Sequence, residues 1–484
     1  MPASKKIIVS LLAITHCLSY CFAQQPVVYS PLQEESTRQK EWSDAAEKKY
    51  KQDLNALPSK NRKYYEELYK ERYDYLKALY TGKKIITAPE ATAYLQSLAT
   101  EVIKHNPALQ SLHYHIVFSK THWPNASSIG EGSIIFNIGL FNRLQNESQA
   151  IFVICHELAH LYLDHSNKSI DRYVSTVYSK EFQRELKTIK KSEYQQGQQL
   201  ESLVKNLAFR NRRHSREHET QADSLAVEWM KQTSFRVEEA LTCLALLDSV
   251  DEDKYNVSPP LEKTFHFKEY PFNPKWVREE KGLFSQLAAA SKAEQKKEKD
   301  SLKTHPDCSL RISRLTPAVQ QYRNNSNRLS PVNETYFRQL QSIFDYEIIE
   351  HCYQSDNVSR SLYYSLQMLA SYPGDPYLIA NTGRCLNRLY SAQKDHTLSK
   401  ITDLPSPFND PKYDKLLQCI QHLRLANIAA FSYYYLTAHE KTMIHYEDFL
   451  EALIRSKEHF NKPEEKQTWV NFYKKQFPKG KYTF

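Results

Sequence analysis

The feature that most constrains the fold is an apolar run over residues 151–163, which is broken by only a few polar side chains. A helix drawn through this run is apolar on almost every side, so it must be buried on all faces. His156 and His160 lie on one face of that helix, about 40° apart, with Glu157 beside them. Burying two imidazoles and a carboxylate is unfavourable unless a partner satisfies them, and a metal ion would be such a partner.

The segment His156-Glu157-Leu158-Ala159-His160 has the spacing of a hydrolytic zinc site. Two imidazoles one turn apart can bind one zinc ion, whereas Glu157 is offset from them and can reach a water at the metal. Zinc lowers the pKa of such a water towards ~7, and the carboxylate accepts its proton during attack. The motif therefore predicts a zinc-dependent protease. His165 follows His160 by five positions, which rotates it away from the metal face, so we do not count it as a ligand.

A third ligand is expected within residues 215–223, a charged segment that is predicted to begin a helix reaching about residue 231. Glu219 and Asp223 are four positions apart and share a helix face. Glu219 can bind the metal, while Asp223 can accept a hydrogen bond from the outer nitrogen of a ligand histidine. Glu217 and His218 are alternative ligands, and charge alone does not choose among them.

These motifs resemble a family of zinc peptidases, the gluzincins related to HtpX, the mitochondrial Oma-type protease, the CAAX prenyl endopeptidases and the periplasmic BepA-type proteases. The family carries the same histidine motif, followed by a helix that begins with a second motif. The matching residues of this chain are Ser215, Arg216, Glu219, Ala222 and Asp223. The resemblance covers about residues 80–320. It implies that Glu219 is the third zinc ligand and that Asp223 supports a ligand histidine.

A segment upstream of the active-site helix also resembles this family. Asn125-Ala126 and residues 132–140 are similar to the family's Asn-Ala, strand and Gly-Leu element, in which an edge strand pairs with the substrate backbone. The resemblance implies that Ser133, Ile134 and Ile135 bind substrate by strand addition. An ordinary core strand is the alternative.

A third resemblance lies further along the chain. Thr304-His305-Pro306 followed by Arg311 is similar to the family's His-Pro element. It implies that His305 lies near the metal, either as a donor to the oxyanion or as a cap on the zinc at rest. Arg311 is implied to bind nearby carboxylate or carbonyl groups.

The N-terminus has the pattern of a secretory signal peptide over residues 1–23. Lys5 and Lys6 precede an apolar stretch, and Cys21-Phe22-Ala23 forms a small-x-small cleavage site. A lipid anchor on Cys21 is the alternative, but it needs a small residue where the chain has Tyr20. The apolar stretch is too short to span a membrane, and we expect no transmembrane helix in the mature chain. The predicted location is therefore periplasmic or secreted.

Composition favours helices. The 484 residues include only 9 glycines, so few tight turns are expected. The net charge is +9, but the basic residues are scattered among acidic ones. This distribution argues against binding nucleic acid. We predict an α+β, mostly helical chain: a helical segment over 24–80, a zinc metallopeptidase domain with a small β-sheet over 81–325, and a helical domain over 336–484. A linker-like run over 324–327 motivates that boundary.

Two further regions carry specific expectations. Residues 166–213 are predicted to form a helical insertion or hairpin over the active site, and 251–303 a long mobile loop. In the last third, Tyr372-Pro373-Gly374-Asp375-Pro376 resembles the turn between tetratricopeptide-type helices, although a plain helical bundle fits as well. An exported chain permits disulfides, and one bridge is expected among Cys352, Cys385 and Cys419.

The predicted function is that of a zinc metalloendopeptidase acting in quality control on unfolded or misfolded exported proteins. One alternative is a chaperone-like factor that binds a partner protein through its C-terminal helices, with proteolysis dormant or secondary. Another is a zinc hydrolase that acts on a non-peptide substrate.

Overall fold

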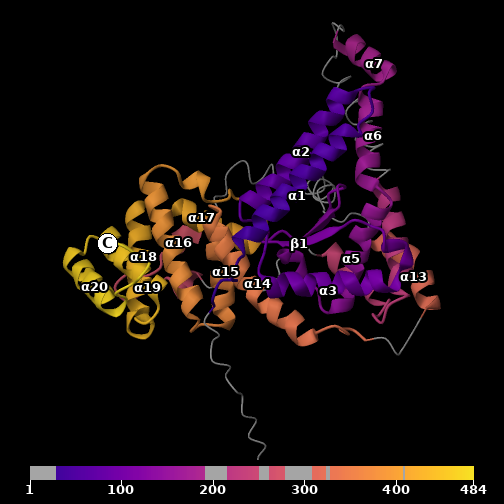
Figure 1. Cartoon of the computed structure of the whole chain (residues 1–484). Coiled ribbons are helices and arrows are strands. Elements are labelled where there is room, and N and C mark those ends of the chain that lie inside the picture. The colour runs from indigo at the N-terminus through magenta and orange to yellow at the C-terminus, as the bar shows by residue number, and fades with distance from the viewer. Residues whose placement is uncertain (1–28, 191–214, 250–260, 278–307, 323–327, 407–408) are drawn as a thin grey trace, which may run out of the picture.

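The computed structural model describes residues 29–190, 215–249, 261–277, 308–322, 328–406 and 409–484. The predicted signal peptide and His305 lie outside these residues. The described chain is mostly helical, with one small sheet (Figure 1). Within it, no helix is both long enough and apolar enough to cross a membrane.

The N-terminal and central elements build the region around the sheet. They are α1 (Ser36–Asn55), α2 (Arg62–Thr81), α3 (Pro89–His105), η1 (Pro107–Leu109), β1 (His115–Ser119), β2 (Ala126–Ser128), β3 (Ser133–Asn137), α4 (Ile138–Phe141), α5 (Glu147–Tyr162), α6 (His165–Val177), α7 (Lys180–Lys190), an unlabelled helix over 215–230, α9 (Glu239–Asp248) and α13 (Cys308–Gln321).

The remaining elements lie mostly in the last third of the chain. They are α10 (Leu261–Thr264), η2 (Pro274–Val277), α14 (Glu334–Gln354), α15 (Val358–Ser371), α16 (Pro376–Lys394), η3 (Leu398–Lys400), α17 (Pro411–His422), α18 (Leu425–Met443), α19 (Glu447–His459) and α20 (Pro463–Gln476).

The α5 helix lies in the centre of the largest apolar cluster, as its sequence predicts. Every residue from Glu147 to Ala159 is buried. Asn146 caps the helix, because its side chain accepts a hydrogen bond from the backbone N–H of Gln149 at 3.0 Å. The apolar faces of α3, α9, α13 and α14 contribute to the same cluster. The active-site helix is thus held rigidly by apolar contacts along its length.

The start of α3 bonds to the N-terminal segment of the described chain. Ala88 occupies the N-cap position and makes no side-chain cap. Thr87 instead donates its hydroxyl to Glu34 at 2.7 Å, and Glu34 also accepts from the backbone N–H of Thr87. The Thr87 side chain is therefore used to bind the N-terminal segment rather than to cap the helix.

The sheet has three strands in the order β1-β3-β2. β1 is parallel to β3, and β2 is antiparallel to it. The strand predicted to be an edge, β3, is therefore the central one. Hydrogen-bonded neighbours on both sides make it a core strand, and the edge nearer to α5 is β2.

A helical arm projects from the sheet region. In Figure 1, α2 and α6 rise beside each other with α7 near the tip. α1 and α2 pack as a hairpin, and α6 contacts α2 through a cluster that includes Leu57, Tyr65 and Val174. The predicted insertion is thus helical in its described part, and its first helix leaves directly from the end of α5.

The α14 helix begins beside the boundary predicted before residue 336, and its two halves lie in different apolar clusters. Phe337, Leu340 and Phe344 in its first half pack into the cluster around α5. Ile349 in its second half packs against residues of α15 and α16. This helix of 21 residues therefore contributes to two apolar clusters.

The C-terminal helices enclose a second core, to which an earlier segment also contributes. Leu261, Phe265 and Phe272 lie in this core, and the rings of Phe265 and Phe431 stack at 4.8 Å. The expectation of a long mobile loop over 251–303 is therefore wrong for residues 261–277, because Phe265 and Phe272 of this segment are buried by the C-terminal helices. The disulfide prediction is also wrong: Cys352, Cys385 and Cys419 are buried free thiols.

Candidate metal centre

Three donor side chains converge where α5 meets the helix over 215–230. His156, His160 and Glu219 each offer a ligand atom, and these atoms all lie within 4.8 Å of one another. Nε2 of His156 lies 3.0 Å from Nε2 of His160. The Glu219 carboxylate oxygens lie 3.5 Å and 3.3 Å from these two nitrogens, respectively. Two segments about 60 positions apart in sequence are thus brought together at one point.

The spacing of these donors fits a tetrahedral metal ion. Nitrogen and oxygen ligands ~2.0–2.1 Å from zinc lie roughly 3.3–3.5 Å from one another. The three distances of 3.0, 3.3 and 3.5 Å fall around that value. Glu217 and His218, the alternative ligands, are not members of the cluster within the described chain, and the His218 ring stacks on His165 instead. The geometry therefore favours Glu219.

Asp223 and Arg311 surround the donors with opposite charges. Nδ1 of His156 lies 3.0 Å from Oδ1 of Asp223, which leaves Nε2 of the same ring directed at the cluster. Arg311 donates two hydrogen bonds of 2.7 Å to Asp223, and its Nη1 lies 3.1 Å from Glu219. Arg311 is only 4% exposed, so this bidentate pair is shielded from water. The two carboxylates are thereby held in one orientation.

Neighbouring carboxylates and imidazoles shift the protonation equilibria of the donors. Burial opposes charge on His156, but the adjacent Asp223 and Glu219 carboxylates overcome it and raise the pKa of His156 to about 10. Burial also opposes ionisation of Glu219, yet His156, His160 and Arg311 hold its pKa well below the usual value. An ionised glutamate beside two imidazoles is the donor set of a hydrolytic zinc site.

His165 has a contact that the sequence did not reveal. It is not a member of the donor cluster, but its Nδ1 lies 3.0 Å from Nδ1 of His160, and its Nε2 lies 3.0 Å from Oε1 of Gln221. Burial, together with His160 and His218, lowers the pKa of His165 to about 4, so the ring is neutral. His160 can then donate its outer N–H to His165, and His165 can donate to Gln221. This chain fixes the His160 tautomer that leaves Nε2 free for a metal.

Replacing His165 with alanine should therefore weaken metal binding. Loss of a partner to a ligand histidine typically lowers metal affinity by about 10- to 100-fold. Competition between the protein and a chromogenic chelator for zinc would measure this change. His105→Ala, at the end of α3, is the matched control and should leave the affinity unchanged. Equal affinities for the two variants would contradict the role assigned to His165.

The predicted substrate residues Ser133, Ile134 and Ile135 do not line an open edge. They are 5%, 1% and 1% exposed, and their strand is paired on both sides. The strand pairs with β1 and β2, the N–H of Ser133 donates to the Glu131 side chain, and the carbonyl of Ser133 accepts from the N–H of Ile129, so this strand offers no open edge. This prediction is wrong because strand order, rather than local sequence, decides which strand is an edge.

Within the described residues, β2 pairs with a neighbouring strand on one side only. Asn125 accepts a hydrogen bond from the N–H of Asn137 at 3.0 Å, and Ile129 donates to Ser133 at 2.9 Å. In an antiparallel pair the backbone groups alternate in direction, so those of Ala126 and Ser128 point away from β3. The carbonyl of Ser128 accepts a hydrogen bond from the hydroxyl of Ser166 at 3.2 Å, which places this edge beside the start of α6.

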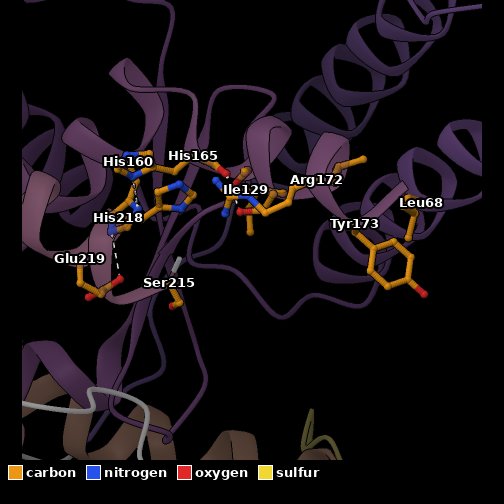
Figure 2. A pocket seen from close by; sticks show the side chains of 12 residues that line it. Leu68, Ile129, His160, His165, Arg172, Tyr173, Ser215, His218 and Glu219 are labelled. Atoms are coloured by element: carbon orange, nitrogen blue, oxygen red, sulfur yellow. Dashed lines mark hydrogen bonds and ion pairs between the residues drawn. The ribbon is translucent and has the colours of Figure 1, made fainter. Parts of the chain in front are cut away.

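A cavity of about 600 Å³ extends from the donor cluster. Its walls come from the helix over 215–230, from α6, from the end of β2 and from α2. Figure 2 shows His160 and Glu219 at one end, with Arg172, Tyr173 and Leu68 towards the other. The three donor side chains are therefore reached from a space large enough for several side chains of a peptide.

Comparison with known proteins agrees with this geometry. Residues 89–319 match the family model of Peptidase family M48. This segment is similar to an M48 peptidase domain. The match spans α3, the sheet, α5, the helix over 215–230 and α13, and so contains His156, Glu157, His160, Glu219, Asp223 and Arg311. No curated protein matches the chain. Members of this family are metal-dependent peptidases, so the match supports a metallopeptidase function for this chain.

Proposed function

We propose that the chain is a zinc-dependent metalloendopeptidase of the gluzincin type, which cleaves unfolded or misfolded segments of exported proteins. The convergence of His156, His160 and Glu219 at the spacing of a tetrahedral site is the observation that carries this proposal. Export is inferred from the basic, apolar and small-x-small pattern of residues 1–23.

The three donors would hold one zinc ion per chain. A bound zinc ion supplies Lewis acidity, which polarises the scissile carbonyl and acidifies an adjacent water. Glu157, which is 6% exposed, follows His156 directly on α5. Its carboxylate accepts a proton from the attacking water and then passes it to the leaving amine. Asp223, held by Arg311, and His165 keep the two ligand rings oriented.

The outward backbone groups of Ala126 and Ser128 provide a place for the substrate. An extended peptide can add to β2 as a further strand, and its main chain then runs beside α5. Cleavage of unfolded segments follows from this mode of binding, because a folded substrate does not offer a free extended strand.

Metal content and activity together test the proposal. We expect the purified mature chain to hold one zinc per chain and to cleave casein, and a chelator should remove both the metal and the activity. Glu219→Ala should lose most of the zinc, because a two-histidine site lacks its third ligand. Glu217→Ala, two positions away, is the control and should retain it. Full zinc content in Glu219→Ala, or cleavage that survives chelation, would overturn the proposal.

A further inference from the structure

The cavity beyond the donor cluster has one wall made by a single face of α6. The residues of this wall are His165, Ser166, Ser169, Ile170, Arg172 and Tyr173. Their spacing of one, three, one, two and one positions is that of one helix face. Across the cavity lie Leu68 of α2 and Ile129 at the end of β2. The cavity is therefore lined by apolar and hydroxyl-bearing side chains, and Arg172 adds a guanidinium group to the wall.

Of the charged side chains of α6, Arg172 lines the cavity, whereas Asp171 and Lys168 do not. Asp171 lies outside the wall and forms a hydrogen bond with Tyr65. Lys168 donates to the carbonyl of Leu163, and Asn167 accepts from Arg72, so these side chains are also engaged outside the cavity. Among the described residues that line the cavity, Glu219 is the only carboxylate, and it belongs to the donor cluster. Arg172 forms no ion pair with any described residue.

We propose that Arg172 is a specificity-determining residue that selects peptide substrates bearing an acidic side chain in this cavity. A guanidinium binds a carboxylate through two parallel hydrogen bonds, and apolar walls strengthen that pairing by excluding water. The inference rests on the proposed peptidase function and adds a substrate class to it. Figure 2 shows Arg172 in the part of the pocket beyond His165, on the side away from Glu219.

The position of the acidic residue follows from the length of the wall. The seven positions from His165 to Arg172 span ~10 Å along α6, since a helix rises ~1.5 Å per residue. An extended peptide advances ~3.3 Å per residue. Arg172 therefore meets a side chain about three or four residues from the bond that lies at the donor cluster.

Matched fluorogenic peptides test this inference. Each peptide carries Glu, Gln or Lys at the third or fourth residue on either side of one scissile bond. We expect the wild type to cleave a Glu peptide with kcat/KM roughly tenfold above its Gln partner at one of these positions. In Arg172→Glu the preference should reverse towards Lys, and in Arg172→Gln it should disappear. Lys187→Glu on α7 makes the same charge change outside the cavity and should keep the wild-type preference.

The outcomes separate this inference from the proposed function. Chelator-sensitive cleavage without an acidic preference, or a preference unchanged in Arg172→Glu and Arg172→Gln, would overturn the role of Arg172 alone. Absence of any cleavage by the wild type would overturn the peptidase proposal and this inference together. Retained cleavage of the Gln peptide by both Arg172 variants shows that they are folded and that only selectivity has changed.

Discussion

Replacing Glu157 with glutamine is expected to lower kcat/KM for casein-derived peptides by about 10²- to 10⁴-fold, the usual contribution of a general acid–base residue. Glutamine has nearly the same shape but cannot accept a proton from the attacking water. Glu157 is not one of the three converging donors, so zinc content should stay at one per chain. The expected result is an inactive protein with an intact metal site.

A second glutamate, Glu228, provides the control for Glu157→Gln. Glu228→Gln changes an exposed glutamate on the helix that carries Glu219, and it should retain full activity. Zinc content, melting temperature and initial rates would be measured for both variants. Cleavage by Glu157→Gln at the wild-type rate would show that another group acts as the base, even if the metal site is correct.

Arg311→Met is expected to destabilise the protein by about 3 kcal/mol. Removing one partner of a buried ion pair leaves the other charge without compensation, and this typically lowers the free energy of unfolding by about 3–5 kcal/mol. Here Asp223 would lose both hydrogen bonds from Arg311. His156 still lies beside Asp223, which places the expected effect near the lower end of that range.

Arg314 supplies a matched control on the same helix. Its exposed guanidinium donates to the hydroxyl of Thr220 at 2.7 Å, so Arg314→Met should change the free energy of unfolding by less than about 0.5 kcal/mol. Urea unfolding of zinc-loaded proteins would measure both changes. Similar urea midpoints for the two variants would show that Arg311 does not stabilise the fold as proposed. A loss of zinc affinity in Arg311→Met alone is also expected, because Asp223 then orients His156 less firmly.

The helices that carry the donors were predictable because their patterns are local. The apolar run over 151–163 predicted α5, and the helix expected from residue 215 is present over 215–230. Helical spacing also placed His156 and His160 on one face of α5. It placed Glu219 and Asp223 on one face of the helix over 215–230. The side chains that define a helix face are only three or four positions apart, so the sequence displays them directly.

The strand order and the boundary between the cores were not predictable in this way. The alternation within residues 133–138 indicates a strand, but it contains no information on which neighbours pair with it. β2, a strand of three residues, makes β3 central and takes the edge position for itself. In the same way, the first half of α14 joins the earlier core because its phenylalanines meet those of β1 and α4.

The sequence by itself determined the chemistry of the centre: two histidines and a glutamate on one helix, and a glutamate and an aspartate on a second. Only the tertiary structure shows that His165 is a hydrogen-bond partner of His160. In a continuous helix His165 would point away from His160, but α5 ends at Tyr162 and Asp164 adopts a left-handed backbone with φ of 56°. The chain therefore turns before α6, and His165 returns to within hydrogen-bonding distance of His160. A backbone reversal at one residue changes the direction of every later side chain, and helical spacing cannot show it.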